Sequence, residues 1–293
     1  KRLNNREHMV ILTIIFAVIF VAIYVSGLLI SEEAVKGSFL NAKCPPGLKH
    51  PFGTDALGRE VFLRTLKGLS VSITIGIAAS LISAVIAVLV GIAASAGNRY
   101  VDSIVNWIID LVMSVPHTIL IILISFVLGR GIKGLLVGIA ATHWCSLARL
   151  IRAEVLQLRS QQYIEVSGRL GKSSGWILIN HILPHLVPQF FVGLVLMFPH
   201  AILHEASISF LGFGLPPEQS AIGIILAESM RGLSTGMWWT AVMPGITLVL
   251  IVLLVDKLGD NFRMILDPYS AQNQSIMIIY EIMNASELIC LYD

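Results

Sequence analysis

Charged side chains are scarce in this chain. Asp, Glu, Lys and Arg together make up 13% of its 293 residues, whereas apolar residues reach 56%. Soluble globular domains carry about 25% charged residues, because most of the residues near their surface must be polar. The composition therefore excludes a soluble protein of this length, and also the disordered, collagen-like and coiled-coil classes. It predicts an integral membrane protein with several spans.

Cysteine is also rare, and the net charge is small. The three cysteines, Cys44, Cys145 and Cys290, are far apart and show no Cys-x-x-Cys spacing, so we expect neither a disulfide framework nor a zinc site. Twenty basic and eighteen acidic residues give a net charge of +2, which offers no basis for nucleic-acid binding. No cofactor is expected.

Six apolar segments approach or exceed the roughly 20 residues that a membrane span needs. They cover residues 9–30, 71–94, 104–128, 132–148, 189–213 and 239–262. None shows the alternation of a barrel strand, so the predicted fold class is all-α, a polytopic membrane protein with about six transmembrane helices. The first segment is longer than the roughly 7–15 apolar residues of a signal peptide, and we interpret it as a retained span.

Two long segments, 31–70 and 149–188, lie outside the predicted spans. We divide the chain into a first helix with its external segment (1–70), a transmembrane domain (71–268) and a tail of unknown role (269–293). With the N-terminus in the cytosol, eleven Lys and Arg residues lie inside and nine outside. This small excess favours that orientation, which makes the loop at 149–188 cytosolic.

The predicted cytosolic loop at 149–188 has glycines before a short helix and prolines after it. Gly168 and Gly171 precede a predicted short helix over about 173–182, and Pro184 and Pro188 follow it. Proline disfavours continuation of a helix, so we expect the helix to end there. A short helix held between two spans suits the groove of a partner protein. The alternative is an amphipathic helix that rests on lipid headgroups.

The sequence Gly171-Lys172-Ser173 imitates the end of a phosphate-binding Walker A loop. The motif G-x-x-x-x-G-K-[ST] requires a glycine at position 166, which is Val166, and no strand is predicted before it. The chain also lacks an H-E-x-x-H motif or a similar acid–base constellation. We therefore expect no nucleotide site and no enzymatic activity in this chain.

The cytosolic loop resembles the Glu-Ala-Ala motif of ATP-binding-cassette importer permeases. That pattern is Glu-Ala-Ala, three residues, Gly, nine residues, Ile, one residue and Leu-Pro. Four positions match it in register: Glu165, Gly171, Leu183 and Pro184. Val166 and Ser167 replace the two alanines, and His181 replaces the isoleucine.

Further stretches are similar to the dipeptide, oligopeptide and nickel branch of this family. They are HPFGTDALGREV at 50–61, HEASISFLGFGLPP at 204–217, and WWTAVMPG at 238–245 with LGDNFRMILDP at 258–268. The resemblance covers about residues 1–268 and leaves the tail outside. It implies the type I importer permease fold.

The resemblance also implies a coupling loop and a set of partners. The residues implied for the loop, which would dock on an ATPase, are Glu165, Gly168, Gly171, His181, Leu183 and Pro184. The partners would be a second permease subunit, two cytosolic ATP-binding subunits, an extracytoplasmic substrate-binding protein and membrane lipid. Such a protein would lie in the cytoplasmic (inner) membrane. A stand-alone secondary transporter is the competing class, but the inverted hydropathy repeats typical of one are not visible.

Ionisable groups within spans are costly to bury and are functional candidates by default. We predict a translocation path along His117, Met197, His200, His204 and Glu205. Imidazole suits nickel, copper and zinc, so His200 and His204 are candidate metal ligands, and nickel or a nickel chelate is the expected cargo. Dipeptide or oligopeptide import is the alternative, and hydrogen bonding between helices is the structural explanation for the same histidines.

Overall fold

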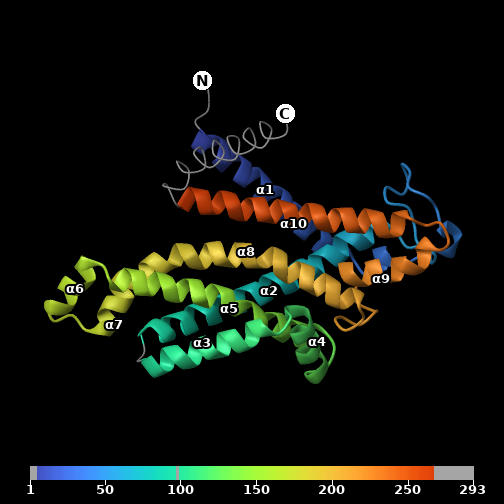
Figure 1. Ribbon diagram of the computed structural model, residues 1–293. Coiled ribbons are helices and arrows are strands. Elements are labelled where there is room, and N and C mark those ends of the chain that lie inside the picture. Colours follow the sequence, from blue (N-terminus) through green and yellow to red (C-terminus); the bar gives the residue numbers. More distant parts are fainter. Residues whose placement is uncertain (1–4, 97–98, 267–293) are drawn as a thin grey trace, which may run out of the picture.

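The computed structural model describes residues 5–96 and 99–266, which form a bundle of helices (Figure 1). In chain order the elements are α1 (Asn5–Leu29), the 3-10 turns η1 (Glu33–Val35) and η2 (Phe39–Asn41), α2 (Val61–Ala96), α3 (Arg99–Ser114), α4 (His117–Val127), α5 (Ile132–Arg159), α6 (Gln162–Arg169), α7 (Ser174–Ile177), the π-helical segment η3 (Leu178–Ile182), α8 (Leu183–Phe210), α9 (Ile222–Leu233) and α10 (Trp239–Leu266). Within these ranges the only β pairing is an isolated bridge between Thr54 and Glu60. The all-α prediction is confirmed, and the predicted tail at 269–293 lies outside the described residues.

The helices provide up to six membrane crossings in the part of the chain that is described. Five are unbroken stretches that are long and apolar enough to span, and they contain α1, α2, α5, α8 and α10. The sixth is the pair α3 and α4, which meet at a bend of 95°. The number agrees with the six predicted spans, although one of them is broken.

The break in the predicted span 104–128 lies at Pro116. This proline precedes α4 with φ −55° and ψ 124°, an extended conformation. The residue before a proline is itself pushed away from helical geometry, which explains why α3 ends at Ser114. The prediction of one continuous helix over 104–128 is therefore wrong, and the signal that could have corrected it was the proline.

Prolines do not end the loop helix as predicted. α7 continues through η3 into α8, which contains Pro184 and Pro188. A proline removes one backbone hydrogen bond, and its ring clashes with the carbonyl four residues earlier. Pro184 is the second residue after η3, whose i→i+5 hydrogen bonding changes the partners of those carbonyls. The π-helical segment thus lets the chain keep its direction where a regular helix would stop.

Two further helix boundaries differ from the sequence prediction. α2 begins at Val61, so the last ten residues of the predicted external segment 31–70 are already helical. α6, which precedes the predicted short helix, was not expected. Both differences add rigid structure next to the membrane-spanning core.

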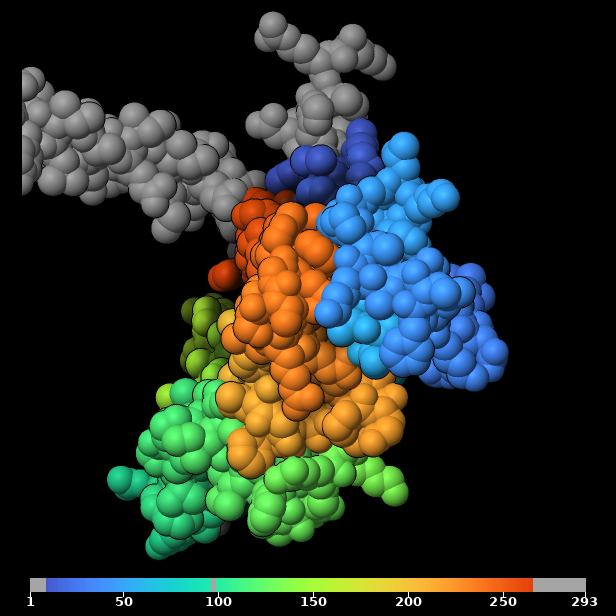
Figure 2. Space-filling model, turned by 90° about the vertical axis from the view of Figure 1, so that its right-hand side faces the viewer, coloured from blue at the N-terminus to red at the C-terminus, as the bar shows by residue number. Residues whose placement is uncertain are grey.

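The two ends of the bundle carry different connections (Figure 1). At one end, here called the α6 end, lie α6, α7 and the start of α1. At the other, the α9 end, lie the segment 31–60 and α9. Figure 2 looks onto the α9 end, where the segment 31–60 (blue) and the α9 region (orange) lie next to each other.

α2 and α8 form the centre of the bundle. Both contribute side chains to all three buried apolar clusters of the described structure. α2 also approaches α5 closely at Gly91, where an added side-chain carbon would lie 2.9 Å from the Ala148 carbonyl oxygen. Small residues allow such contacts between membrane helices. α1 instead exposes many apolar side chains, such as Leu28 and Leu29, as expected for a helix bordered by lipid.

Candidate functional site

The loop at the α6 end begins with a turn that depends on glycine. Gly171 has φ +82°, a left-handed conformation that glycine adopts without strain. The Leu170 N–H donates to the Val166 carbonyl at 2.9 Å, and the Lys172 N–H donates to the Ser167 carbonyl at 3.2 Å. These bonds satisfy carbonyls at the end of α6. Gly171 therefore sets the direction in which the chain leaves α6 toward α7.

Ser173 and Lys172 define the start of α7. The Ser173 hydroxyl oxygen accepts a hydrogen bond from the Trp176 N–H at 3.2 Å, which is an N-cap contact. The ammonium of Lys172 lies 4.6 Å from the centre of the Trp176 ring, within the range of a cation–π interaction. The residues that imitate a Walker A ending thus have a structural role in the turn.

His181 lies at the centre of the loop. Its Nε2 atom is 3.3 Å from the Ser167 hydroxyl oxygen on α6. Its ring centre is 5.7 Å from that of Tyr163 and 5.2 Å from that of Trp176, both at steep angles. His181 therefore connects η3 with α6 and α7 and holds the loop together as one unit.

The loop is anchored to the core through η3 and the first turn of α8. Ile182 and Leu186 are each 1% exposed, and they belong to the same apolar cluster as Ala148 and Val155 of α5. A force on the loop is therefore transmitted to α5 and α8 through close packing, because protein interiors are nearly incompressible.

The outward surface of this loop is a mixture of apolar and charged side chains. Leu170 is 77% exposed and Ile179 is 63% exposed. Beside them, the exposed Glu165 and Arg169 form an ion pair of 2.6 Å within α6. The remaining predicted loop residues, Gly168, Leu183 and Pro184, are exposed as well. Exposed apolar side chains gathered at one end of a protein mark a contact surface.

Three histidines from different helices lie together in the bundle. The ring centres of His117 (α4), His143 (α5) and His204 (α8) are separated by 5.8 Å, 5.0 Å and 6.5 Å for the pairs 117–143, 143–204 and 117–204. The Nδ1 atom of His143 is 3.0 Å from the Ile139 carbonyl oxygen. The buried Nδ1 atom of His117 has no hydrogen-bond partner. The structure thus joins two predicted path residues, His117 and His204, with His143, which the predicted path omitted.

The other predicted path residues lie in different surroundings. His200 is exposed on α8, whereas Met197 packs against the apolar cluster around Ile182. Across residues 5–96 and 99–266, no group of three or more His, Cys, Asp or Glu side chains is arranged to hold a metal ion. The described residues around His200 and His204 therefore do not form a ligand set for a metal ion, and the geometry gives the tentative metal site no support.

Glu205 is fully buried. Its Oε1 atom accepts a hydrogen bond of 2.9 Å from the Ser209 hydroxyl, and the Ser209 oxygen in turn accepts the Leu215 N–H at 3.3 Å. This chain of contacts links α8 to the segment that follows it. The position suits a structural group, and the side chain does not face open space.

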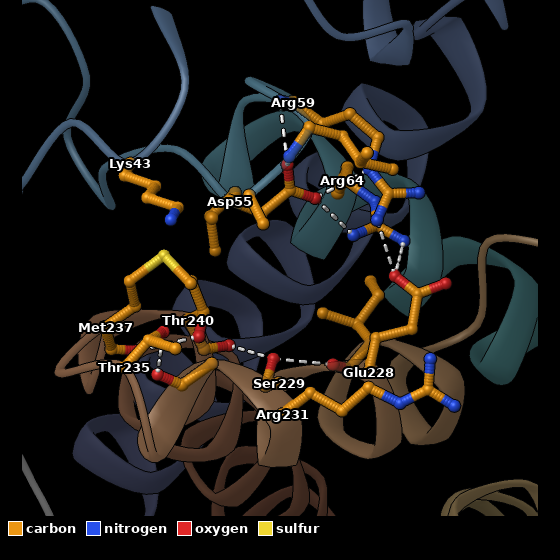
Figure 3. Close-up of a pocket in the computed structure, with 15 residues that line it drawn as sticks. Lys43, Asp55, Arg59, Arg64, Glu228, Ser229, Arg231, Thr235, Met237 and Thr240 are labelled. Carbon is orange, nitrogen blue, oxygen red and sulfur yellow. Dashed lines mark hydrogen bonds and ion pairs between the residues drawn. The ribbon is translucent and has the colours of Figure 1, made fainter. Parts of the chain in front are cut away.

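Sequence reasoning did not predict a charged cavity at the α9 end (Figure 3). Its volume is about 400 Å³, and it lies between residues 43–64 and the α9–α10 region. Arg59 and Arg64 both bind Asp55, at 2.6 Å and 3.1 Å, and both bind Glu228, at 2.7 Å and 2.8 Å. Asp55 and Arg59 belong to the stretch HPFGTDALGREV, but nothing in that stretch indicates a partner 169 residues away on α9.

Residues 87–268 match the family described as the binding-protein-dependent transport system inner membrane component. A relative from Brucella suis biovar 1 (strain 1330) is 37% identical over 224 residues, which cover 76% of this chain and 75% of the relative. The oligopeptide transport system permease protein OppC of Bacillus subtilis (strain 168) is 33% identical over 265 residues, with coverage of 90% and 86%. The dipeptide transport system permease protein DppC of the same organism is 30% identical over 268 residues, with coverage of 92% and 84%.

Proposed function

Because the chain belongs to the family of binding-protein-dependent transport system inner membrane components, the permeases of ATP-binding-cassette importers, we propose that it forms half of a pore for dipeptides or oligopeptides. Membership of this family makes it a multi-pass inner-membrane protein and not an enzyme. In such importers, ATP hydrolysis belongs to separate subunits, and a substrate-binding protein delivers the cargo. The second half of the pore would be another permease subunit.

The cargo proposal is supported by the names of the relatives. The two Bacillus subtilis relatives are an oligopeptide and a dipeptide transport system permease. The nickel hypothesis has no comparable support, and the described residues contain no group arranged to hold a metal ion. The peptide alternative therefore replaces nickel as the proposed cargo.

One observation carries the coupling mechanism: α8 is physically continuous with the loop. The helical stretch Ser174–Phe210 joins the loop at the α6 end to the segment of α8 that carries His200 and His204. A partner that binds the exposed loop surface and moves it would tilt α8 as a lever. The movement would shift the histidine-bearing part of α8 against α4 and α5, which is how closure of the ATPases could change access to the pore.

The same loop sets the proposed orientation. ATPase subunits are cytosolic, so a loop that docks on them must face the cytosol. The chain enters α1 at the α6 end and returns to that end before α6 (Figure 1). The N-terminus then lies in the cytosol, and the α9 end faces the extracytoplasmic side.

His200 is the predicted path residue best placed for contact with a peptide. It is exposed on α8, whereas Glu205 is fully buried and Met197 is packed. Imidazole can both donate and accept hydrogen bonds, which matches the amide groups of a peptide backbone. His117, His143 and His204 would support the helices on which the path is built.

The proposal can be tested by uptake and by cross-linking. A strain that lacks the gene should lose uptake of radiolabelled dipeptide or oligopeptide and keep uptake of radioactive nickel; the opposite result would restore the nickel hypothesis.

A photo-cross-linker at Leu170 on the loop should capture the ATPase subunit. The matched control is Leu29, the last residue of α1, which is 79% exposed and lies toward the α9 end of the bundle. A cross-linker at Leu29 should not capture the ATPase subunit. Capture of lipid alone at Leu170 would favour the interfacial-helix alternative.

A further inference from the structure

The cavity at the α9 end contains more positive than negative side chains. Four basic residues line it: Lys43, Arg59, Arg64 and Arg231. Two acidic residues line it: Asp55 and Glu228. The excess of two positive charges makes the cavity attractive to an anion, provided that the acidic side chains are already neutralised.

Both acidic side chains bind the two central arginines. Asp55 Oδ2 accepts from Arg59 and Arg64, and its Oδ1 accepts from the backbone N–H groups of Leu57 and Arg59, each at 2.9 Å. Glu228 Oε2 accepts from both arginines as well. The Arg64 side chain is 7% exposed, so this ion-pair network forms one side of the cavity and is held in place by packing.

Lys43 and Arg231 are the cations left over. In the described parts of the chain, neither side chain has an ion-pair partner, and both are exposed. Figure 3 shows the Lys43 side chain extending over the cavity from the side opposite Glu228. Their charges are not needed to neutralise a group of this chain.

The cavity has an open rim and a closed base. The base is formed by side chains that are at most 5% exposed: Val61, Ile225, Met237 and Thr240. The rim includes exposed residues such as Lys43, Leu57 and Thr235. A cavity that is closed below cannot be the mouth of a passage through the bundle, but it can receive a side chain from outside.

The surroundings of the rim suit a protein surface. Leu57, Trp238 and Met230 are 45%, 50% and 53% exposed at the same end of the molecule. Protein interfaces are enriched in aromatic residues, Met and Arg. Two acidic side chains elsewhere at this end are already paired, Glu32 with Lys67 and Glu33 with Lys36. An acidic protrusion of a partner would therefore meet little repulsion from these two residues, and the exposed Glu218, between α8 and α9, does not line the cavity.

We propose that this docking cavity receives an Asp or Glu side chain of the substrate-binding protein, with Lys43 as its direct cationic contact. The guanidinium of Arg231 lies on the other side of Glu228 from Lys43 (Figure 3) and adds positive charge at the edge of the cavity. The inference rests on the proposed function, which supplies the partner and places the α9 end outside the membrane. Charge complementarity of this kind accelerates encounter and fixes the register of two proteins. The cavity would thus align the binding protein on the permease.

A carbodiimide experiment tests the contact directly. Carbodiimide joins a lysine amine to a carboxylate as an amide, with the lost water taken up by the reagent as a urea. The assembled importer in lipid nanodiscs should yield a cross-link between Lys43 and an Asp or Glu of its binding protein, identified by mass spectrometry. Lys49 is the matched control, because it is exposed in the same segment but does not line the cavity. A cross-link from Lys43 to a free peptide instead of the binding protein would overturn the proposal in favour of a cargo site.

Binding measurements separate this inference from the proposed function. The double variant Lys43→Gln/Arg231→Gln should bind the binding protein on the order of tenfold more weakly, mainly through slower association, and should depend less on salt. Lys49→Gln should bind like the wild type, and basal ATPase activity should be unchanged in all variants. If wild type and double variant bind equally, the docking cavity is refuted while the importer function stands. If the wild type binds no substrate-binding protein at all, both fail.

Discussion

The Nε2 atom of His181 lies 3.3 Å from the hydroxyl oxygen of Ser167. These two positions depart from the Glu-Ala-Ala pattern, which has alanine and isoleucine there. The structure shows that the two departures are in contact. The hydrogen bond and the ring contact with Tyr163 link η3 to α6, and the ring contact with Trp176 links η3 to α7.

The first prediction concerns this pair. His181→Ala should reduce peptide transport per ATP hydrolysed several-fold, because the loop loses its central contact. The pattern-restoring variant Ser167→Ala/His181→Ile should keep more coupling than His181→Ala. A double-mutant cycle should give an interaction free energy of about 0.5–1.5 kcal/mol, typical of one hydrogen bond. Uptake and ATPase activity in proteoliposomes measure the coupling; equal coupling in His181→Ala and wild type would contradict the prediction.

The second prediction uses two glycines of the same loop. An added side-chain carbon at Gly168 or Gly171 would meet no atom within 4 Å, but only Gly171 has a positive φ. Gly171→Ala should therefore strain the turn by about 1–2 kcal/mol and uncouple hydrolysis from transport. Gly171→Asn should do so less, since asparagine tolerates this conformation better. Gly168→Ala is the control and should leave coupling and membrane abundance unchanged.

The spans were predictable because hydrophobic length is a local property of the sequence. The break at Pro116 was also readable, since a proline restricts the residue before it. The continuation of the helix through Pro184 could not be predicted from the sequence. It depends on the hydrogen-bond pattern of η3, and that pattern is held by His181 and by Ile182 in the core. Local rules fail where packing elsewhere decides the backbone.

The candidate sites were predictable only in part, because sequence does not give side-chain neighbours. His117 and His204 could be chosen from their depth in the spans, but their contact with His143 depends on how α4 folds back beside α5. Glu205 looked like a path residue by depth alone and is buried beside Ser209. The network of Asp55 with Glu228 joins segments that only the folded chain brings together.

The third prediction concerns the stability of the α9 end. Arg64 is nearly buried and binds both Asp55 and Glu228. Arg64→Met should remove these bonds and destabilise the protein by about 1–3 kcal/mol, because Asp55 and Glu228 each lose one of the two guanidinium donors that they share with Arg59. In the background Glu228→Gln the same substitution should cost less, since the residues share one network. Thermal unfolding in detergent measures both effects; strictly additive losses would contradict the coupling.

The fourth prediction separates cargo contact from structural support among the histidines. His200 is exposed on α8, whereas His143 packs 5.0 Å from His204, measured between ring centres, and bonds to the Ile139 carbonyl. His200→Ala should lower peptide uptake without lowering membrane abundance or the unfolding temperature. His143→Ala should lower the unfolding temperature, because it removes packing between α5 and α8 as well as a hydrogen bond. Wild type and both variants should bind no nickel in a direct titration, since no group of three or more potential ligands in the described parts of the chain is arranged to hold a metal ion. If His200→Ala transports peptide at the wild-type rate, α8 does not contact the cargo there; if only the wild type binds nickel, the metal hypothesis must be taken up again.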